Sequence, residues 1–347
     1  MTTFITGGTS LLGRVMVQEL VRQGEAVRIL VRPDSNQSGL ELPGVAFVRG
    51  EIHDLVDVRK GIAGCDWVCH LTGPADANVS EAEGWRAQLE GTRNVLQAAQ
   101  DIRSTAVVQV SSLIALGPTQ PGETADEAHQ APAGGQLAAY QKSQRAADDL
   151  AREYGAKGLP VKLVYPGFGY GSARATRPAS LLQQTLLRLA AGQVGAIVGN
   201  GRNRIAATYL RDVAQGIILA HTHGRPGEGY LLVGESLTLP QMWLAIADLL
   251  EKTPPRRRLP LWLAQLSAGL AQLGGSRTRY PADFLSMARY DWNFSSEKAA
   301  RDLGWRPYPF REGIAAAWEE LQAQGWGGAA KRPPTPMKPN APARRSL

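Results

Sequence analysis

Residues 3–13 read TFITGGTSLLG: a short apolar run, a glycine-rich loop and the start of a helical pattern that ends at Gly24. The loop is therefore expected between a strand and a helix. In that place Gly7 permits a tight turn, and Gly13 permits close packing of the helix on the strand. The N–H groups at the start of the helix can bind a pyrophosphate. A turn with a purely structural role is the alternative, and the strand–loop–helix context disfavours it.

Short β-branched runs alternate with helical patterns through the first half of the chain. The expected strands cover residues 3–5, 26–31, 45–48, 67–71, 106–110 and 161–165. Continuously apolar strands between helices are typical of a parallel sheet that is covered on both faces. The predicted fold class is α/β, a Rossmann-type doubly wound parallel sheet with a smaller interleaved C-terminal substrate region.

The length of 347 residues leaves room for more than one structural unit. Residues 1–165 form the expected NAD(P)-binding Rossmann domain, and residues 205–225 return to it. Residues 166–204 and 226–321 form the expected substrate-binding region. From residue 322 the composition turns to Gly, Pro, Ala and basic residues, which predicts a disordered Pro-rich basic tail over 322–347.

The formal charge of +7 suggests nucleic acid or an anionic membrane as a partner. Five of the seven excess charges, however, lie in the tail at Lys331, Arg332, Lys338, Arg344 and Arg345. No helix-turn-helix, zinc finger or aromatic RNA platform is recognisable in the sequence. We therefore expect no nucleic-acid partner.

Cys65 and Cys69 are the only cysteines, too few for a disulfide framework and without the partners of a metal site. We expect buried thiols in a reducing compartment. His221 and His223 lie at a helix end without further ligands, which favours a solvated helix terminus over a metal site. Neither a secretory leader nor a membrane-spanning apolar run is visible, so a soluble cytoplasmic protein without a metal is predicted.

Further motifs occur in order along the chain. They are GEI at 50–52, HLTG at 70–73, EGTRNV at 90–95, VSS at 110–112, Tyr140, PG at 166–167, FSSEKA at 294–299 and DLGW at 302–305. Together with the loop, they resemble the extended short-chain dehydrogenase/reductase family. This family includes NAD-dependent epimerases/dehydratases and dihydroflavonol-4-reductase-like reductases, and the resemblance covers about residues 2 to 320.

The resemblance implies a dinucleotide bound along the carboxyl ends of the strands. Its expected contacts are Gly7, Gly8, Ser10, Leu11, Leu12, Gly13, Arg32, Glu51, Ile52, Leu71, Thr72, Gly73, Tyr140, Gln144, Pro166 and Gly167. An arginine after the second strand accompanies the NADP phosphate, so Arg32 favours NADP(H) over NAD(H). Asp34 keeps NAD(H) as an alternative, and a solvated strand end is the alternative for Arg32.

The resemblance also implies hydride transfer between the nicotinamide and a carbinol carbon, assisted by a serine, a tyrosine and a lysine. Ser112 and Tyr140 fall at the serine and tyrosine positions, but the expected lysine is Gln144. The i, i+4 spacing keeps Gln144 on the Tyr140 face of a helix. An amide supplies no charge to lower the tyrosine pKa from its usual ~10.

Two further departures concern Ser10, which replaces the middle glycine of the loop, and Gln88, which stands where the family usually has Asn. These departures divide the hypotheses. One is an NAD(P)-dependent enzyme that reduces a ketone, or that epimerises or dehydrates a sugar-nucleotide-like substrate. The other is a catalytically weak or inactive NADP(H)-binding structural, accessory-subunit or sensor protein.

The resemblance also implies that the chain forms a homodimer through the two long central helices or is an accessory subunit of a larger complex.

Arg256, Arg257 and Arg258 precede a helical pattern that contains Trp262, Leu263 and Leu266. A basic cluster beside an apolar helix indicates either a peripheral membrane contact or a core-facing helix with a solvated basic start. The ordinary amphipathic pattern favours the core-facing helix.

Overall fold

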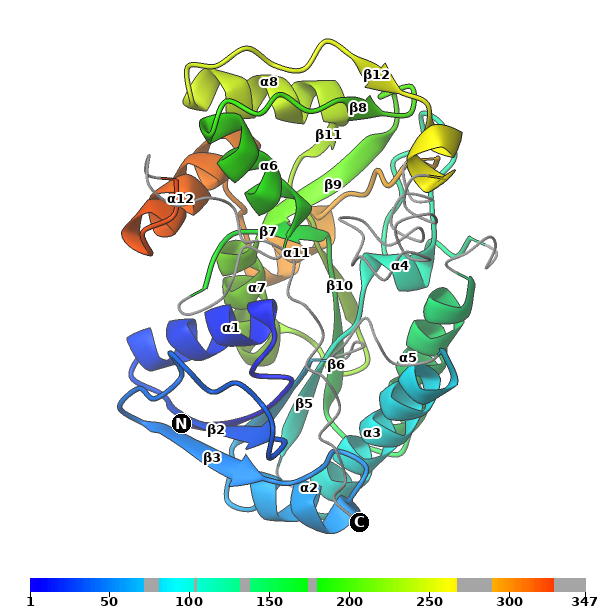
Figure 1. Ribbon diagram of the computed structural model, residues 1–347. Coiled ribbons are helices and arrows are strands. Elements are labelled where there is room, and N and C mark those ends of the chain that lie inside the picture. The colour runs from blue at the N-terminus through cyan, green and yellow to red at the C-terminus, as the bar shows by residue number, and fades with distance from the viewer. Residues whose placement is uncertain (72–80, 103–104, 132–137, 174–179, 267–288, 328–347) are drawn as a thin grey trace, which may run out of the picture.

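The computed structural model describes residues 1–71, 81–102, 105–131, 138–173, 180–266 and 289–327. Its centre is a sheet of seven parallel strands in the order β10-β6-β5-β4-β1-β2-β3 (Figure 1). The strands are β1 (Thr2–Thr6), β2 (Ala26–Val31), β3 (Val45–Arg49), β4 (Trp67–Leu71), β5 (Ala106–Val110), β6 (Val161–Pro166) and β10 (Gly229–Leu232). The order reverses between β1 and β4, and a doubly wound sheet binds its ligand beyond the carboxyl ends of the strands at that point.

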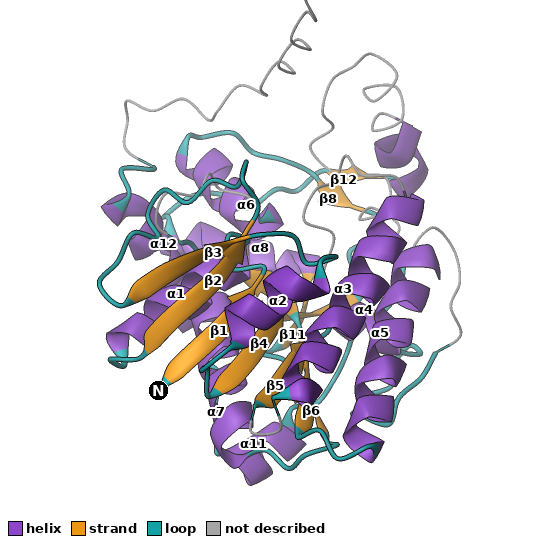
Figure 2. Ribbon diagram, turned by 90° about the horizontal axis from the view of Figure 1, so that it is seen from below, coloured by secondary structure: helices purple, strands orange, loops and turns teal. Residues whose placement is uncertain are grey.

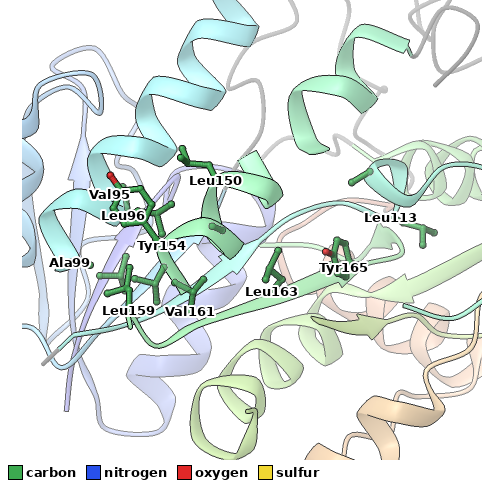
Figure 3. Packing of buried hydrophobic residues seen from close by; sticks show 14 of the residues in the cluster. Val95, Leu96, Ala99, Leu113, Leu150, Tyr154, Leu159, Val161, Leu163 and Tyr165 are labelled. Carbon is green, nitrogen blue, oxygen red and sulfur yellow. The ribbon is translucent and has the colours of Figure 1, made fainter. Parts of the chain in front are cut away.

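Helices cover both faces of the sheet (Figure 2). On one face lie α2 (Leu55–Ile62), α3 (Glu81–Asp101) and α5 (Ala138–Ala156), and on the other lie α1 (Leu11–Arg22), α7 (Leu210–His223) and α11 (Glu297–Leu303). Side chains alternate along a strand, so Phe4 packs toward α2 and α3 while Ile5 packs toward α1. Leu96 of α3, Leu150 of α5 and Leu163 of β6 belong to one apolar cluster (Figure 3).

A smaller group of elements lies beyond the sheet, at the top of Figure 1. Its strands are β7 (Phe168–Tyr170), β8 (Ile197–Val198), β9 (Arg204–Tyr209), β11 (Ser236–Thr238) and β12 (Arg258–Leu259), and its helices are α6 (Leu181–Ala190), α8 (Leu239–Leu249) and α12 (Phe310–Ala323). The short α4 (Leu113–Leu116) follows β5. A third core joins Tyr170, Tyr209 and Phe310.

The predicted α/β fold class is confirmed, and the structure adds two details at its boundaries. The sheet takes in β10, outside the predicted return segment 205–225, because Gly229–Leu232 pairs with β6. The folded part also runs past residue 321, because α12 ends at Ala323 and Trp326 packs against the third core. The division into a dinucleotide-binding and a substrate-binding region stays a prediction, and residues 328–347 lie outside the described part.

The prediction of a core-facing helix after Arg258 is wrong for the side chains that the structure describes. In its described part, residues 261–266, Ala264 is buried and Leu261 is half-buried in a small apolar cluster. Leu263 and Leu266, expected on the buried side, are exposed together with Trp262. Among the residues that the structure describes, this cluster contains Val198, Leu259, Leu261 and Ala264, which are too few to bury a second row of side chains.

Candidate active site

The glycine-rich loop joins β1 to α1 with very little space around it. Gly7 has a φ of +69°, and a Cβ there would lie 2.9 Å from the carbonyl oxygen of Leu71. A Cβ at Gly13 would lie 2.2 Å from the Gly7 oxygen. Only glycine fits these two positions, as the sequence predicts for a tight turn and a close helix–strand contact.

Ser10 is the N-cap of α1. Its φ of −68° is ordinary for a side-chain-bearing residue, and its Oγ accepts from the Gly13 N–H at 3.0 Å. The first N–H groups of a helix have no intrahelical acceptor. Those of Leu11 and Leu12 consequently have no partner within the described chain and point out of the helix start. The arrangement fits the pyrophosphate of a dinucleotide.

Other predicted cofactor contacts surround this loop. Leu71 ends β4 directly beside Gly7. Arg32 follows β2 with its side chain half exposed, 3.6 Å from the Asp34 carboxylate. Exposed pairs of this kind are weak, so Arg32 is available to a ligand. Ile52 packs against α3 and accepts from the Asn94 amide through its carbonyl at 3.0 Å.

Three more expected contacts lie at neighbouring strand ends. Glu51 is exposed after β3. Pro166 ends β6, and the N–H of Gly167 donates to the Leu232 carbonyl of β10 at 3.1 Å. Gly8 touches the sheet, since a Cβ there would lie 2.5 Å from Ile29. Thr72 and Gly73, also expected at the cofactor, lie outside the described residues.

The three predicted catalytic side chains lie together. Ser112 caps the start of α4 directly after β5, where its Oγ accepts from the Ile114 N–H at 3.2 Å. Tyr140 and Gln144 occupy one face of α5, and the Gln144 amide donates to the Tyr140 hydroxyl at 3.0 Å. The Ser112 side chain also hydrogen-bonds with Tyr140.

The two glutamines that depart from the family pattern are partners. Gln88 of α3 donates from its amide to the Gln144 carbonyl oxygen at 3.3 Å, and both side chains are buried. A lysine here would leave the Gln88 donor facing a cation. Gln88 and Gln144 therefore form one uncharged pair that fixes the amide beside Tyr140.

Burial raises the pKa of Tyr140 above its ordinary value, the Asp148 carboxyl acts in the same direction, and the hydrogen bonds with Gln144 and Ser112 oppose the shift. The two basic side chains near Gln144 in the sequence, Lys142 and Arg145, are not directed at Tyr140. Arg145 donates to the carbonyls of Ala115 at 2.6 Å and Leu116 at 3.1 Å. Lys142 is exposed. The phenol therefore stays protonated near neutral pH.

His70 is the packed histidine that the sequence indicates. The Thr92 hydroxyl donates to the Gln88 carbonyl at 2.7 Å, so its oxygen accepts from His70 Nε2, 3.1 Å away. His70 Nδ1 then accepts from the Thr6 hydroxyl at 2.6 Å. Burial lowers the pKa of His70 to about 3, so the ring is neutral.

Sequence reasoning does not single out Asp148, which lies four residues beyond Gln144 on the same face of α5. One carboxyl oxygen accepts from the Ser111 hydroxyl at 2.9 Å, and burial raises the pKa of Asp148 to about 7. The repeated i, i+4 spacing of Tyr140, Gln144 and Asp148 is the signal that points to it.

The two cysteines and His221 pack against neighbouring side chains. Cys65 and Cys69 are buried free thiols. His221 stacks on Trp67 with ring centroids 4.2 Å apart, and its carbonyl accepts from Lys162 at 2.6 Å. At the end of α7, His221 is thus half-buried, whereas His223 is exposed as the sequence predicts. Burial lowers the pKa of His221 to about 4.

Comparison with known proteins agrees with this geometry. A family model described as the NAD dependent epimerase/dehydratase family matches residues 3–233. The chain belongs to this family. The resemblance to extended short-chain dehydrogenases/reductases is thereby confirmed, and the chain is of the NAD(P)-linked oxidoreductase type.

Two curated relatives cover nearly the whole chain. A protein of Synechocystis sp., provisionally named dihydroflavonol 4-reductase, is 29% identical over 93% of this chain and 95% of its own. A protein of Stigmatella aurantiaca, named 4-hydroxy-2-methyl-3-oxo-4-farnesyl-3,4-dihydroquinoline-1-oxide ketoreductase, is 28% identical over 88% of this chain and 92% of its own. The crystal structure of gox2253 has a TM-score of 0.77 at 29% identity, covering 93% of this chain and 98% of that one.

Within the described residues, no helix of this family member is long and apolar enough to cross a lipid bilayer.

Proposed function

We propose that this family member is an NAD(P)H-dependent carbonyl reductase in which neutral Tyr140 donates the proton. The observation that carries the proposal is the contact between Tyr140 and the uncharged Gln144 amide. Because Gln144 donates to the phenol oxygen, the phenol hydrogen remains available for a substrate oxygen. Ser112, which also contacts Tyr140, would hold that oxygen.

The bound dinucleotide would supply a hydride to the carbonyl carbon. Tyr140 would give its proton to the carbonyl oxygen, so that the product is an alcohol, and would regain a proton from solvent. This direction needs no ionised tyrosine before the reaction. Epimerisation and dehydration of a sugar nucleotide begin with removal of a hydroxyl proton, for which the raised pKa of Tyr140 is unfavourable.

A ketone is the proposed reacting group, supported by the relative from Stigmatella aurantiaca that is named a ketoreductase. NADP(H) is the proposed cofactor, supported by the half-exposed Arg32 after β2. Leu11, Leu12 and Gly13 at the start of α1 would bind the pyrophosphate. Glu51 and Ile52 would lie near the adenine.

The test is nicotinamide fluorescence titration with NADPH and NADH, followed by turnover with ketone and nucleotide-sugar panels. We expect tighter binding of NADPH and reduction of ketones. Tyr140→Phe should lower kcat by roughly 10²–10⁴-fold at unchanged nucleotide affinity. Turnover that survives Tyr140→Phe would contradict the role of Tyr140, and saturable binding of neither nucleotide would contradict the whole proposal.

A second candidate function, an NADP(H)-binding protein without turnover, is favoured by the same missing charge at Gln144. It predicts tight nucleotide binding, no turnover with either panel, and activity gained in Gln144→Lys. The two candidates therefore differ in one measurement, the turnover of the unaltered chain.

A further inference from the structure

Residues 256–266 present an unusual surface. Trp262 is the most exposed large hydrophobic side chain of the described residues at 65%, and Leu266 and Leu263 of the same helix are exposed by 51% and 39%. The spacing of these three residues puts them on one side of the helix. Three such side chains together are more than the scattered apolar residues of an ordinary surface.

This segment is held firmly at the top of the molecule, where β12 and the short helix after it lie far from β2 and β3 (Figure 1). β12 pairs with β8, and the Ile197 N–H donates to the Arg257 carbonyl at 2.9 Å. Ala264 packs beneath the helix against Val198 and Leu259. The exposed face is therefore displayed by an ordered backbone that is anchored from below.

The charge of the segment is entirely positive. Arg256, Arg257 and Arg258 are exposed, and residues 256–266 contain no Asp or Glu. None of the three guanidinium groups forms an ion pair with any residue that the structure describes. Positive charge beside tryptophan and leucine is the combination that binds a membrane surface, with arginines at lipid phosphates and apolar side chains at the acyl boundary.

We infer that residues 256–266 dock this protein on a membrane surface that contains anionic lipid. A second copy of the chain fits the same face poorly. A two-fold contact places a patch against itself, so the positive charge of one copy would face the positive charge of the other. The inference does not depend on the proposed reaction.

Co-sedimentation of the full chain with vesicles tests it. We expect pelleting with phosphatidylcholine–phosphatidylglycerol vesicles, little with phosphatidylcholine alone, and release by salt. Arg256→Gln/Arg257→Gln/Arg258→Gln should weaken binding about 5-fold per arginine. Trp262→Ser/Leu266→Ser should weaken it as well, whereas Leu244→Ser, a comparably exposed leucine on α8, should not. Repeating the assay with residues 328–347 deleted separates the contribution of residues 256–266 from that of the basic tail.

Several results would overturn the inference. One is the absence of pelleting with anionic vesicles, and another is pelleting that both patch variants retain in the tail-deleted chain. Concentration-dependent self-association that Leu266→Ser abolishes, without vesicle binding, would assign the face to a second copy. The NADPH affinity should be equal in all these variants, because none of them lies in the proposed dinucleotide site, so a failed docking test leaves the proposed nucleotide binding unaffected.

Discussion

Tyr140 lies beside an amide where the resemblance of the sequence leads us to expect an ammonium group. Gln144 and Gln88 form one pair across α5 and α3, so the two substitutions depend on each other. A pattern comparison finds each of them separately from its position. Their contact could not be predicted, because the relative rotation of two helices depends on how both pack on the sheet.

Gln144→Lys should increase the rate of alcohol oxidation relative to ketone reduction. An ammonium group beside Tyr140 favours the phenolate and lowers the tyrosine pKa. In the unaltered protein we expect the ketone reduction rate to be flat between about pH 6 and 9, and alcohol oxidation to rise with pH. In the lysine variant, oxidation near pH 7 should increase about tenfold for each unit by which the pKa falls. Initial rates in both directions against pH measure this.

Gln144→Met is the matched control, because it keeps the length of the side chain without charge or hydrogen bonds. It should not gain oxidation at neutral pH. An equal gain in both variants would show that the lost amide contact, rather than the new charge, alters Tyr140.

Asp148 should make stability depend on pH. Burial raises the pKa of Asp148 to about 7, whereas an unfolded aspartate titrates near ~3.9. The folded protein keeps a proton that the unfolded chain releases. The contribution is therefore fully present below about pH 4 and is lost as pH rises through about 7. Asp148→Asn should raise the free energy of unfolding relative to wild type above pH 7, by at most about 4 kcal/mol.

Denaturant unfolding at a series of pH values measures that difference. Glu319→Gln, at an exposed position of α12, is the control and should leave the wild-type pH profile of stability unchanged. A constant offset between wild type and Asp148→Asn at every pH would contradict a titrating buried carboxyl.

At the scale of elements, the long patterns were predictable and the short ones were not. α1 and the strands of the main sheet follow from local glycine and apolar patterns. β7 has only three residues and pairs with β9. The Trp292 N–H, from a distant part of the chain, donates to the Arg204 carbonyl of β9 at 2.9 Å. Strands held by such remote partners have no local signal.

The junction of β1 and α1 should not tolerate a methyl group. Gly13→Ala would place a Cβ against the Gly7 carbonyl, so the start of α1 must shift. Such overpacking costs about 1–3 kcal/mol. If this free-energy cost destabilises the nucleotide-bound form alone, the affinity for NADPH drops by roughly 5- to 150-fold. Fluorescence titration and thermal unfolding measure the two effects.

Gly155→Ala on α5 is the control, because a Cβ there meets no atom within 4 Å. It should leave nucleotide affinity unchanged. Unaltered affinity in Gly13→Ala would show that the loop is not the pyrophosphate site.

At the scale of the whole molecule, composition marks the beginning of the tail a few residues too early. The switch to Gly and Pro begins near residue 322, yet Gln324 donates to the Ser172 hydroxyl at 2.8 Å and Trp326 packs on the third core. Composition reports an average over many residues, whereas a single tryptophan can extend the folded part. The exposure of Trp262 was also not predictable from the sequence. An apolar pattern shows which residues share a helix face, but not whether other residues pack against that face.

Two truncations separate the folded end of the chain from the tail. Deleting residues 328–347 removes the five basic residues of the tail and should leave both the melting temperature and the NADPH affinity unchanged. Deleting residues 322–347 also removes Gln324 and Trp326, and loss of the buried part of Trp326 should destabilise the protein by roughly 1.5–3 kcal/mol. Thermal unfolding and fluorescence titration of both chains measure this. An NADPH affinity that is already weaker in the shorter deletion would mean that the tail reaches the dinucleotide. Equal stability of the two chains would mean that Trp326 adds nothing to the third core.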